Sequence, residues 1–283
     1  MARKRFDDED DDDRPRRSRR RDDDDEDFDE RPRRRRSKPK SGLPTWAWVA
    51  IPLGLVLLLC CGFVSLPLLL PAVSKVRSAA SKAKQTNNIK QIGLALHGLH
   101  DVNGGFTAPF ALDDNKQPNP GLSWRVGVLP FIEQNAVYAQ FDRSKSWDSP
   151  RNQPFSNQKI STYTSPDELN AAGANTVMFG FNGPGALMEA NVKPPLTFAR
   201  IPDGLSNTAM VAEVTIGAPW ASPMDVPYTR NGPLPSFGAA GNDSFLLLMA
   251  DGSVRNVKKN IPPAIMHALI QIDDGQVINL DGF

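Results

Sequence analysis

The sequence predicts an α+β protein: a disordered N-terminal tail, a long transmembrane helix, and a domain in which that helix continues against an antiparallel sheet. Three observations support this prediction. Residues 1–42 consist largely of alternating charged runs, residues 43–73 contain no charged side chain, and residues 74–283 mix apolar and polar positions with Pro, Gly and Asn. These ranges define the expected tail, membrane helix and extracytoplasmic domain.

The tail holds about half of the charge of the chain. Of the 33 Lys and Arg residues 16 precede Ser41, as do 15 of the 32 Asp and Glu residues, which leaves 17 of each sign in the remainder. A segment with so few apolar residues cannot offset the entropy of ordering, so we expect disorder. The neutral remainder has no basic stripe, and nucleic-acid binding by the globular domain is not expected.

The uncharged run includes WAWVAIPLGLVLLLCCGFVSLPLLL, which exceeds the ~20 residues needed to cross a bilayer. Trp46 and Trp48 stand at its start, where aromatic rings favour the membrane interface. A cleaved secretory signal fits less well, because 40 residues of charged tail precede the run. Seven basic residues flank the run on the N-terminal side and five on the other, so the positive-inside rule predicts a cytoplasmic N-terminus and an exported domain.

Cys60 and Cys61, the only cysteines, both fall inside this run. The exported domain therefore has no disulfide framework and must be stabilised by packing. We interpret the pair as small apolar residues of the membrane helix.

Beyond the membrane the helix is expected to continue to Gly104 and Gly105, with one apolar face that a sheet must cover. That face is formed by apolar residues at spacings of three and four, namely Val73, Val76, Ala80, Ala83, Ile89, Ile92, Leu96 and Leu99.

The remaining chain has the composition of short strands and loops. Residues 176–181 and 208–214 are expected to be strands, and residues 244–257 a hairpin around Asp251 and Gly252, a pair that favours tight turns. Residues 115–121 are predicted to be a loop, and residues 123–141 a short strand or turn followed by a helix. Residues 273–283 are expected to form a last strand pair, turning at Asp274 and Gly275.

Four segments resemble a known family: NNIKQIGLALHGLHDVNGGF, LSWRVGVLPFIEQNAVYAQFD, IPDGLSNTAMVAEV and MADGSVRNV, which begin at residues 87, 122, 201 and 249. In this order they resemble the planctomycete family called domain of unknown function 1559, from about Leu69 to the end. The resemblance implies an exported, pilin-like domain, similar to pseudopilins of type II secretion. Its motif positions here are Asn88, Gln91, Gly93, His97, His100, Asp101, Trp124, Asp203, Gly204, Ser206, Asn207, Thr208, Glu213, Asp251 and Gly252.

The sequence departs from the family pattern at two places. Prepilin signals end in Gly, an apolar residue, Thr and a nearby Glu, whereas Gly42 is followed by LPTWAW and the apolar run contains no acidic residue. Many family members carry a His-x9-Asp-Gly motif, and Gly241 stands where that His would be.

Three polar groups are candidates for chemistry. His97, His100 and Asp101 lie three and four positions apart and could share a helix face as metal ligands, but the favoured interpretation is packing and hydrogen bonding at the helix end. Ser206 lacks a G-x-S-x-G elbow, so DGLSNT is interpreted as a structural turn. The spacing in residues 273–283 does not match a calcium loop.

We therefore expect a non-enzymatic, single-pass envelope protein that needs no cofactor and has a structural or binding role with protein partners in the envelope. Two alternatives remain: a processed pseudopilin of a type II secretion-like or pilus system, and a membrane-anchored signalling protein that acts through its cytoplasmic tail. The sequence predicts neither an oligomeric state nor a particular partner.

Overall fold

A computed structural model describes residues 43–106, 109–164, 173–190 and 195–280, without the side chains of residues 59–74. The predicted tail, the side chains of Cys60 and Cys61, and the last three residues lie outside the described part. The chain divides into two units, residues 1–61 and 62–283, and α1 (Ala47–Asn103) extends from the first into the second.

In the first unit, the described residues form the beginning of α1. Its large apolar side chains are exposed, for example Trp48 at 72% and Leu58 at 74%. Among the side chains that the structure describes, which omit the centre of the apolar run, no helix is long and apolar enough to cross a membrane.

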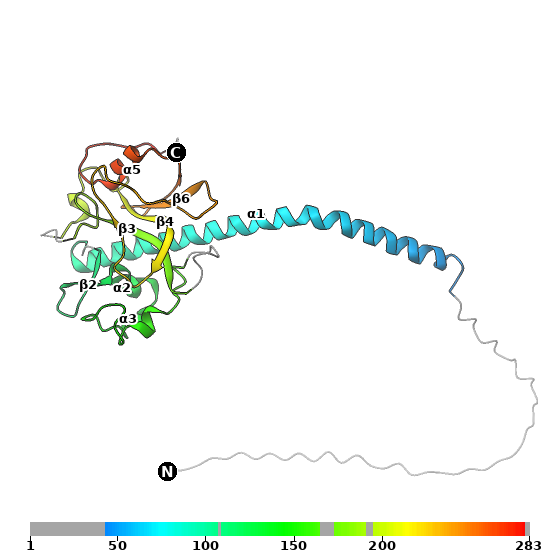
Figure 1. Ribbon diagram of the computed structural model, residues 1–283, viewed down its shortest axis with the longest axis horizontal. Coiled ribbons are helices and arrows are strands. Elements are labelled where there is room, and N and C mark those ends of the chain that lie inside the picture. Colours follow the sequence, from blue (N-terminus) through cyan, green and yellow to red (C-terminus); the bar gives the residue numbers. More distant parts are fainter. Residues whose placement is uncertain (1–42, 107–108, 165–172, 191–194, 281–283) are drawn as a thin grey trace, which may run out of the picture. The chain divides into compact units, whose positions relative to one another are not determined.

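The second unit is built on a five-stranded sheet with the order β5-β3-β4-β6-β7 (Figure 1). Its neighbours pair antiparallel, except for a short parallel contact between β3 and β5. The mixed α+β class and the antiparallel pairing agree with the prediction. The strands are β3 (Asn175–Asn182), β4 (Ala209–Pro219), β5 (Val226–Pro227), β6 (Ser244–Met249) and β7 (Val254–Lys258).

Both faces of the sheet are buried, and β6 shows this best. Leu246 and Leu248 join the core on the α1 side, whereas Phe245, Leu247 and Met249 join the core that includes α5 (Pro263–Ile270). Burial on both faces explains why this strand is a continuous apolar run and does not alternate with polar residues. In Figure 1, α1 and α5 flank the sheet on opposite sides.

The predicted apolar face of α1 is only half correct. Ile89, Ile92 and Leu96 are almost fully buried against the sheet. Val76 is 69% exposed, and Ala80 and Ala83 are exposed as well. Apolar spacing continues along the whole stripe, but burial begins only near Gln85, so periodicity alone could not locate where the sheet starts to cover the helix.

Short elements fill the chain between α1 and β3. The loop predicted at residues 115–121 instead enters β2 (Pro118–Ser123), which pairs with β1 (Phe110–Leu112). The helix predicted within residues 123–141 is broken into three short pieces, since Pro130 and the left-handed Glu133 (φ 62°) interrupt it. The three pieces are α2 (Trp124–Val128), η1 (Leu129–Ile132) and α3 (Asn135–Tyr138). A further short helix, α4 (Gln153–Ser156), follows them.

The other strand predictions have mixed outcomes. The strands at residues 176–181 and 208–214, the hairpin at 244–257, and the end of the long helix before Gly104 are confirmed. The predicted change of direction at Asp274 and Gly275 is present, with Gly275 at a φ of 72° and Asp274 Oδ1 accepting the Gln276 N–H at 2.8 Å, but the predicted strand pair is wrong for the described residues 273–280, which form no strand. The Asp203 carboxylate accepts hydrogen bonds from the backbone N–H groups of Asp274 and Gly275, so these two donors do not pair with a neighbouring strand.

Gly183 allows the close backbone approach that joins β3 to the segment after β5. Asn182 O accepts the Tyr228 N–H at 2.8 Å, and a Cβ on Gly183 would overlap the Tyr228 carbonyl group. We expect Gly183→Ala to destabilise the protein by about 2 kcal/mol or more, because backbone, unlike a side-chain end, cannot move aside cheaply. Urea unfolding followed by circular dichroism measures this change.

The control for that experiment is Gly127→Ala in α2, where an added Cβ meets only Leu99 at ordinary contact distance (3.7 Å). Its stability should stay within about 1 kcal/mol of the parent or rise slightly, because Ala favours helix. Equal losses in the two variants would contradict the proposed backbone clash.

Candidate functional site

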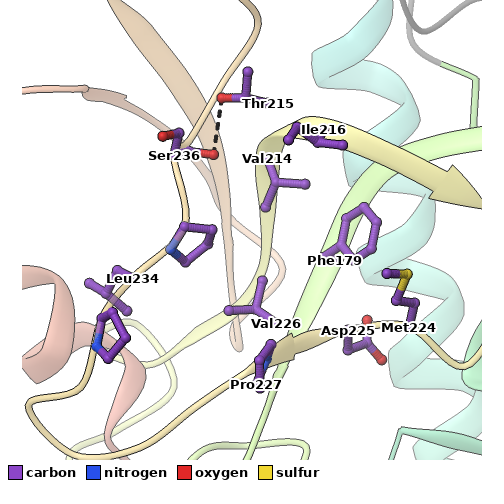
Figure 2. A pocket seen from close by; sticks show the side chains of 12 residues that line it. Phe179, Val214, Thr215, Ile216, Met224, Asp225, Val226, Pro227, Leu234 and Ser236 are labelled. Carbon is purple, nitrogen blue, oxygen red and sulfur yellow. Dashed lines mark hydrogen bonds between the residues drawn. The ribbon is translucent and has the colours of Figure 1, made fainter.

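An apolar groove of about 530 Å³ lies on the α5-side face of the sheet, close to β5 (Figure 2). Its volume is in the range of small-ligand and peptide-binding pockets. Phe179 of β3 and Val214 of β4 form part of its lining, and Ile216 and Met224 are exposed at 82% and 58%. The complete lining is Phe179, Val214, Thr215, Ile216, Met224, Asp225, Val226, Pro227, Pro233, Leu234, Pro235 and Ser236.

The wall that contains Pro233, Leu234 and Pro235 is held at both ends. At one end the Ser236 carbonyl accepts hydrogen bonds from the Thr215 N–H (2.9 Å) and from Thr215 Oγ1 (3.0 Å, Figure 2). At the other end the Gly232 carbonyl accepts a hydrogen bond from His267 Nε2 of α5 at 3.0 Å. Because Pro also restricts the backbone between these points, the wall is preorganised.

The same imidazole fixes a buried tyrosine. Nε2 of His267 donates to the Gly232 carbonyl, and Nδ1 of the same ring lies 3.3 Å from the Tyr228 hydroxyl oxygen. Gln271 Nε2 donates to the same hydroxyl oxygen at 3.0 Å. The three side chains therefore connect α5 to the chain that leaves the groove.

A buried ion pair lies at the base of the groove. Arg125 Nη2 is 2.8 Å from Asp225 Oδ1, and both side chains are fully buried. The guanidinium carbon lies 4.5 Å from the centre of the Trp124 ring and 5.0 Å from that of Phe179. Phe179 therefore contributes one ring both to the groove lining and to the surroundings of the cation.

The charges of this pair are accompanied by further hydrogen bonds. Asp225 also accepts the Gly180 N–H at 2.9 Å and Trp124 Nε1 at 3.0 Å. Arg125 donates to the Met178 carbonyl (3.1 Å) and to Ser123 Oγ (2.8 Å). Burial raises the pKa of the Asp225 carboxyl, whereas the neighbouring guanidinium and N–H donors act in the opposite direction.

This arrangement is suited to binding. The polar side chains at the base already have protein partners, and Thr215 Oγ1 contacts the carbonyls of Ser236 and Gly238. Among the residues that line the groove, there is no hydroxyl paired with a histidine that could act as its base. A ligand would therefore meet apolar side chains over a rigid, satisfied polar base.

The histidines of the helix end lie elsewhere and make packing contacts. His97 Nε2 donates to the Ala250 carbonyl at 2.8 Å, and the Phe198 N–H donates to His100 Nε2 at 3.3 Å. Both rings contact the Phe198 ring, with centroids 4.4 and 4.1 Å away. Asp101 contacts His100 Nδ1 at 3.1 Å. Within the described part of the chain, no group of three or more His, Cys, Asp or Glu side chains is arranged to hold a metal ion.

The DGLSNT segment forms a turn that hydrogen-bonds to itself. Asn207 Nδ2 donates to the Asp203 carbonyl (3.0 Å), Thr208 Oγ1 donates to the Gly204 carbonyl (3.1 Å), and Gly204 has a φ of 85°. Ser206 is exposed. These contacts agree with the structural interpretation of the motif.

This turn also contacts the hairpin. The Thr208 carbonyl accepts the Ala250 N–H at 2.8 Å, while the Asp251 carboxylate accepts the Ser253 N–H at 2.8 Å. Gly252 takes up the left-handed conformation of the hairpin turn, with a φ of 82°. Because His97 also hydrogen-bonds to the Ala250 carbonyl, three of the four sequence segments meet at this residue.

The remaining motif positions also make tertiary contacts. Asn88 Nδ2 donates to the Ser161 carbonyl, and Gln91 Oε1 accepts the Thr162 hydroxyl. Gly93 lies against Leu248, where a Cβ would approach to 2.9 Å. Glu213 Oε2 accepts the Leu246 N–H at 3.1 Å. Trp124 is one of the motif positions, whereas its partners Arg125 and Asp225 are not among them.

Of these two partners, only Arg125 has a recognisable sequence signal, because it is a lone charged residue within the apolar segment SWRVGVLPF. Asp225 lies in a loop without a distinctive pattern. Gly241, at the position of the family histidine, has a φ of 85° and open space around its missing Cβ.

A family model described as a protein of unknown function, DUF1559, matches residues 74–233, which is more than half of the chain. No curated protein and no solved structure matches.

Removing one charge of the buried Arg125–Asp225 pair should strongly lower the stability of the protein. Asp225→Ala should lower the free energy of unfolding by about 3–5 kcal/mol, because the guanidinium of Arg125 would stay buried without its carboxylate. Urea unfolding of the single variant, Arg125→Met and the double variant gives the coupling energy. The double variant should lose clearly less than the sum of the single losses.

The exposed pair Arg230–Asp273, with side chains 49% and 48% exposed, supplies the control. Asp273→Ala should cost at most about 1 kcal/mol, because solvent screens this pair. Similar losses for Asp225→Ala and Asp273→Ala would contradict the importance of the buried pair.

Proposed function

The chain belongs to the DUF1559 family of proteins of unknown function, and from this premise we propose that it is a membrane-anchored, pilin-like cell-envelope protein with a binding role and no catalytic activity. The N-terminus is cytoplasmic in this proposal and the C-terminal domain extracytoplasmic. The apolar groove carries the proposal, because its lining offers an apolar binding surface while the polar groups at its base have partners within the protein.

The anchor is supported by the uncharged run of residues 43–73 and by the start of α1. Several large apolar side chains there are more than half exposed, including Ile51 at 57%, Leu53 at 67% and Leu55 at 60%. Such a surface is unfavourable in water and favourable in lipid. The pilin-like part of the proposal is supported by a long helix whose C-terminal part packs on an antiparallel sheet.

The proposed occupant of the groove is an apolar segment of another envelope protein. The Pro233–Leu234–Pro235 wall and the exposed side chains of Ile216 and Met224 offer apolar surface, and a preorganised wall lowers the entropy cost of binding. Exposed apolar surface beside a formed groove is typical of interaction sites.

The anchor predicts that the protein keeps its tail. The intact mass of the protein extracted from its native membrane should equal that of all 283 residues. A mass shortened near Gly42 would instead identify a processed pseudopilin. Deleting residues 1–40 tests the signalling alternative, because an exported binding domain should function without the tail.

The groove predicts binding of an apolar probe. A fragment of residues 75–283 should increase the fluorescence of Nile red, an uncharged apolar dye, and Ile216→Lys with Met224→Lys should weaken this binding about tenfold or more, because two ammonium groups would need desolvation. Circular dichroism checks that the fragment and its variants remain folded.

The matched control is Val277→Lys, which adds a charge at a side chain that is 79% exposed and outside the groove lining. Dye affinity should remain at the parent level in this variant. Equal weakening by both sets of substitutions would show that the dye binds somewhere else.

A further inference from the structure

Among the residues that line the apolar groove, only Met224 carries sulfur. Its side chain lies in the lining together with Phe179 (Figure 2), and the residue is 58% exposed. Because a dissolved oxidant reaches an exposed thioether without any opening of the fold, Met224 is the preferred target among the methionines that the structure describes. The others are each at most 2% exposed, namely Met178, Met188, Met210, Met249 and Met266.

The backbone of Met224 is held in place although its side chain is exposed. The next residue, Asp225, is fixed by its buried ion pair with Arg125. Arg125 Nη1 also donates to the Met224 carbonyl at 3.5 Å. A chemical change in the Met224 side chain therefore acts on the groove itself, because the segment cannot move away without breaking the buried pair.

Oxidation would change the character of this part of the groove. A hydroperoxide transfers one oxygen atom to the sulfur: the O–O bond breaks, an S=O bond forms, the thioether loses two electrons, and the peroxide is reduced to water or an alcohol. The product, methionine sulfoxide, is polar. An apolar ligand that covers it must remove its hydration without replacing the lost hydrogen bonds, which is unfavourable.

The same oxidation leaves the interior of the domain as it is. Met224 belongs to neither of the two buried cores, whereas each of the other five methionines packs in one of them. A sulfoxide in a core would disrupt its packing, but a sulfoxide at Met224 faces solvent until a ligand arrives. Oxidation at this position therefore changes ligand binding while the fold persists.

We propose that Met224 is a reversible oxidation site that controls the apolar groove: the thioether form binds an apolar segment, and the sulfoxide form releases it. This inference rests on the proposed function of the groove and adds its regulation by hydroperoxides. Methionine sulfoxide reductases reverse the step, since a dithiol supplies two electrons, becomes a disulfide, and the sulfoxide oxygen leaves as water.

The test uses the full-length protein in nanodiscs of saturated lipid, before and after treatment with hydrogen peroxide. Peptide mapping by mass spectrometry should show the gain of one oxygen at Met224 about tenfold faster than at any of the five buried methionines. Fluorescence anisotropy of a fluorescein-labelled peptide, Gly-Leu-Ile-Leu-Gly-Ser, measures binding, with empty nanodiscs as the background. Peptide affinity should fall about tenfold after oxidation and recover after treatment with methionine sulfoxide reductases and dithiothreitol.

Substitutions separate the sulfoxide from other oxidation products, such as those of Cys60 and Cys61. Met224→Leu has no sulfur, so peroxide treatment should not change the peptide affinity of this variant. Met224→Gln places a polar group in the groove, so its affinity should be about tenfold below that of the parent without any peroxide. Met266→Leu, at a buried methionine outside the groove lining, should respond to peroxide as the parent does.

The inference is overturned if the buried methionines oxidise before Met224, if peptide affinity is unchanged once Met224 is oxidised, or if Met224→Leu loses affinity as the parent does. Loss of the circular dichroism signal on oxidation of Met224 would also overturn it, because the residue would then have a structural role. Failure of the untreated protein to bind the peptide would contradict the proposed binding function and the inference that rests on it. That failure is distinguishable, because it is seen before any peroxide is added.

Discussion

The packing of one face of α1 on the sheet is the constraint on which the rest of this domain depends. Ile89, Ile92 and Leu96 close the core on that side, and Gly93 lets the helix approach Leu248. The helix end is then joined to the hairpin by His97 and to the Phe198 segment by His100. Residues that look catalytic in the sequence therefore hold the sheet in place against the helix.

The Arg125–Asp225 pair likewise holds separate segments of the chain together beside the apolar groove. It links α2 to the segment before β5 and also reaches β3 through the Met178 carbonyl and the Gly180 N–H. Replacing a buried ion pair by apolar residues is often neutral for stability, so its value here lies in specifying which strands and loops meet. The same contacts fix the shape of the groove lining.

Local patterns predicted the elements with strong local signals, but long-range contacts decided the rest. The Asp251–Gly252 turn and the end of α1 at the two glycines follow from backbone conformation, which a few residues determine. Val76 and Ile89 belong to the same apolar stripe, but Val76 is exposed and Ile89 is buried. The difference depends on where the sheet begins to cover the helix, which the spacing of apolar residues does not specify. Asp225 illustrates the same limit for the site, since its partner is 100 residues away in the sequence.

The two ends of the strand order have a consequence for how copies of this protein can associate. At one edge β5 contributes only two residues, and Pro227 has no N–H to offer another strand. At the other edge β7 carries Arg255 and Lys258, and flanking charges of this kind oppose strand addition. Crowded copies are thus discouraged from merging their five-stranded sheets into continuous β-structure, so higher-order assembly would have to use other surfaces of the protein.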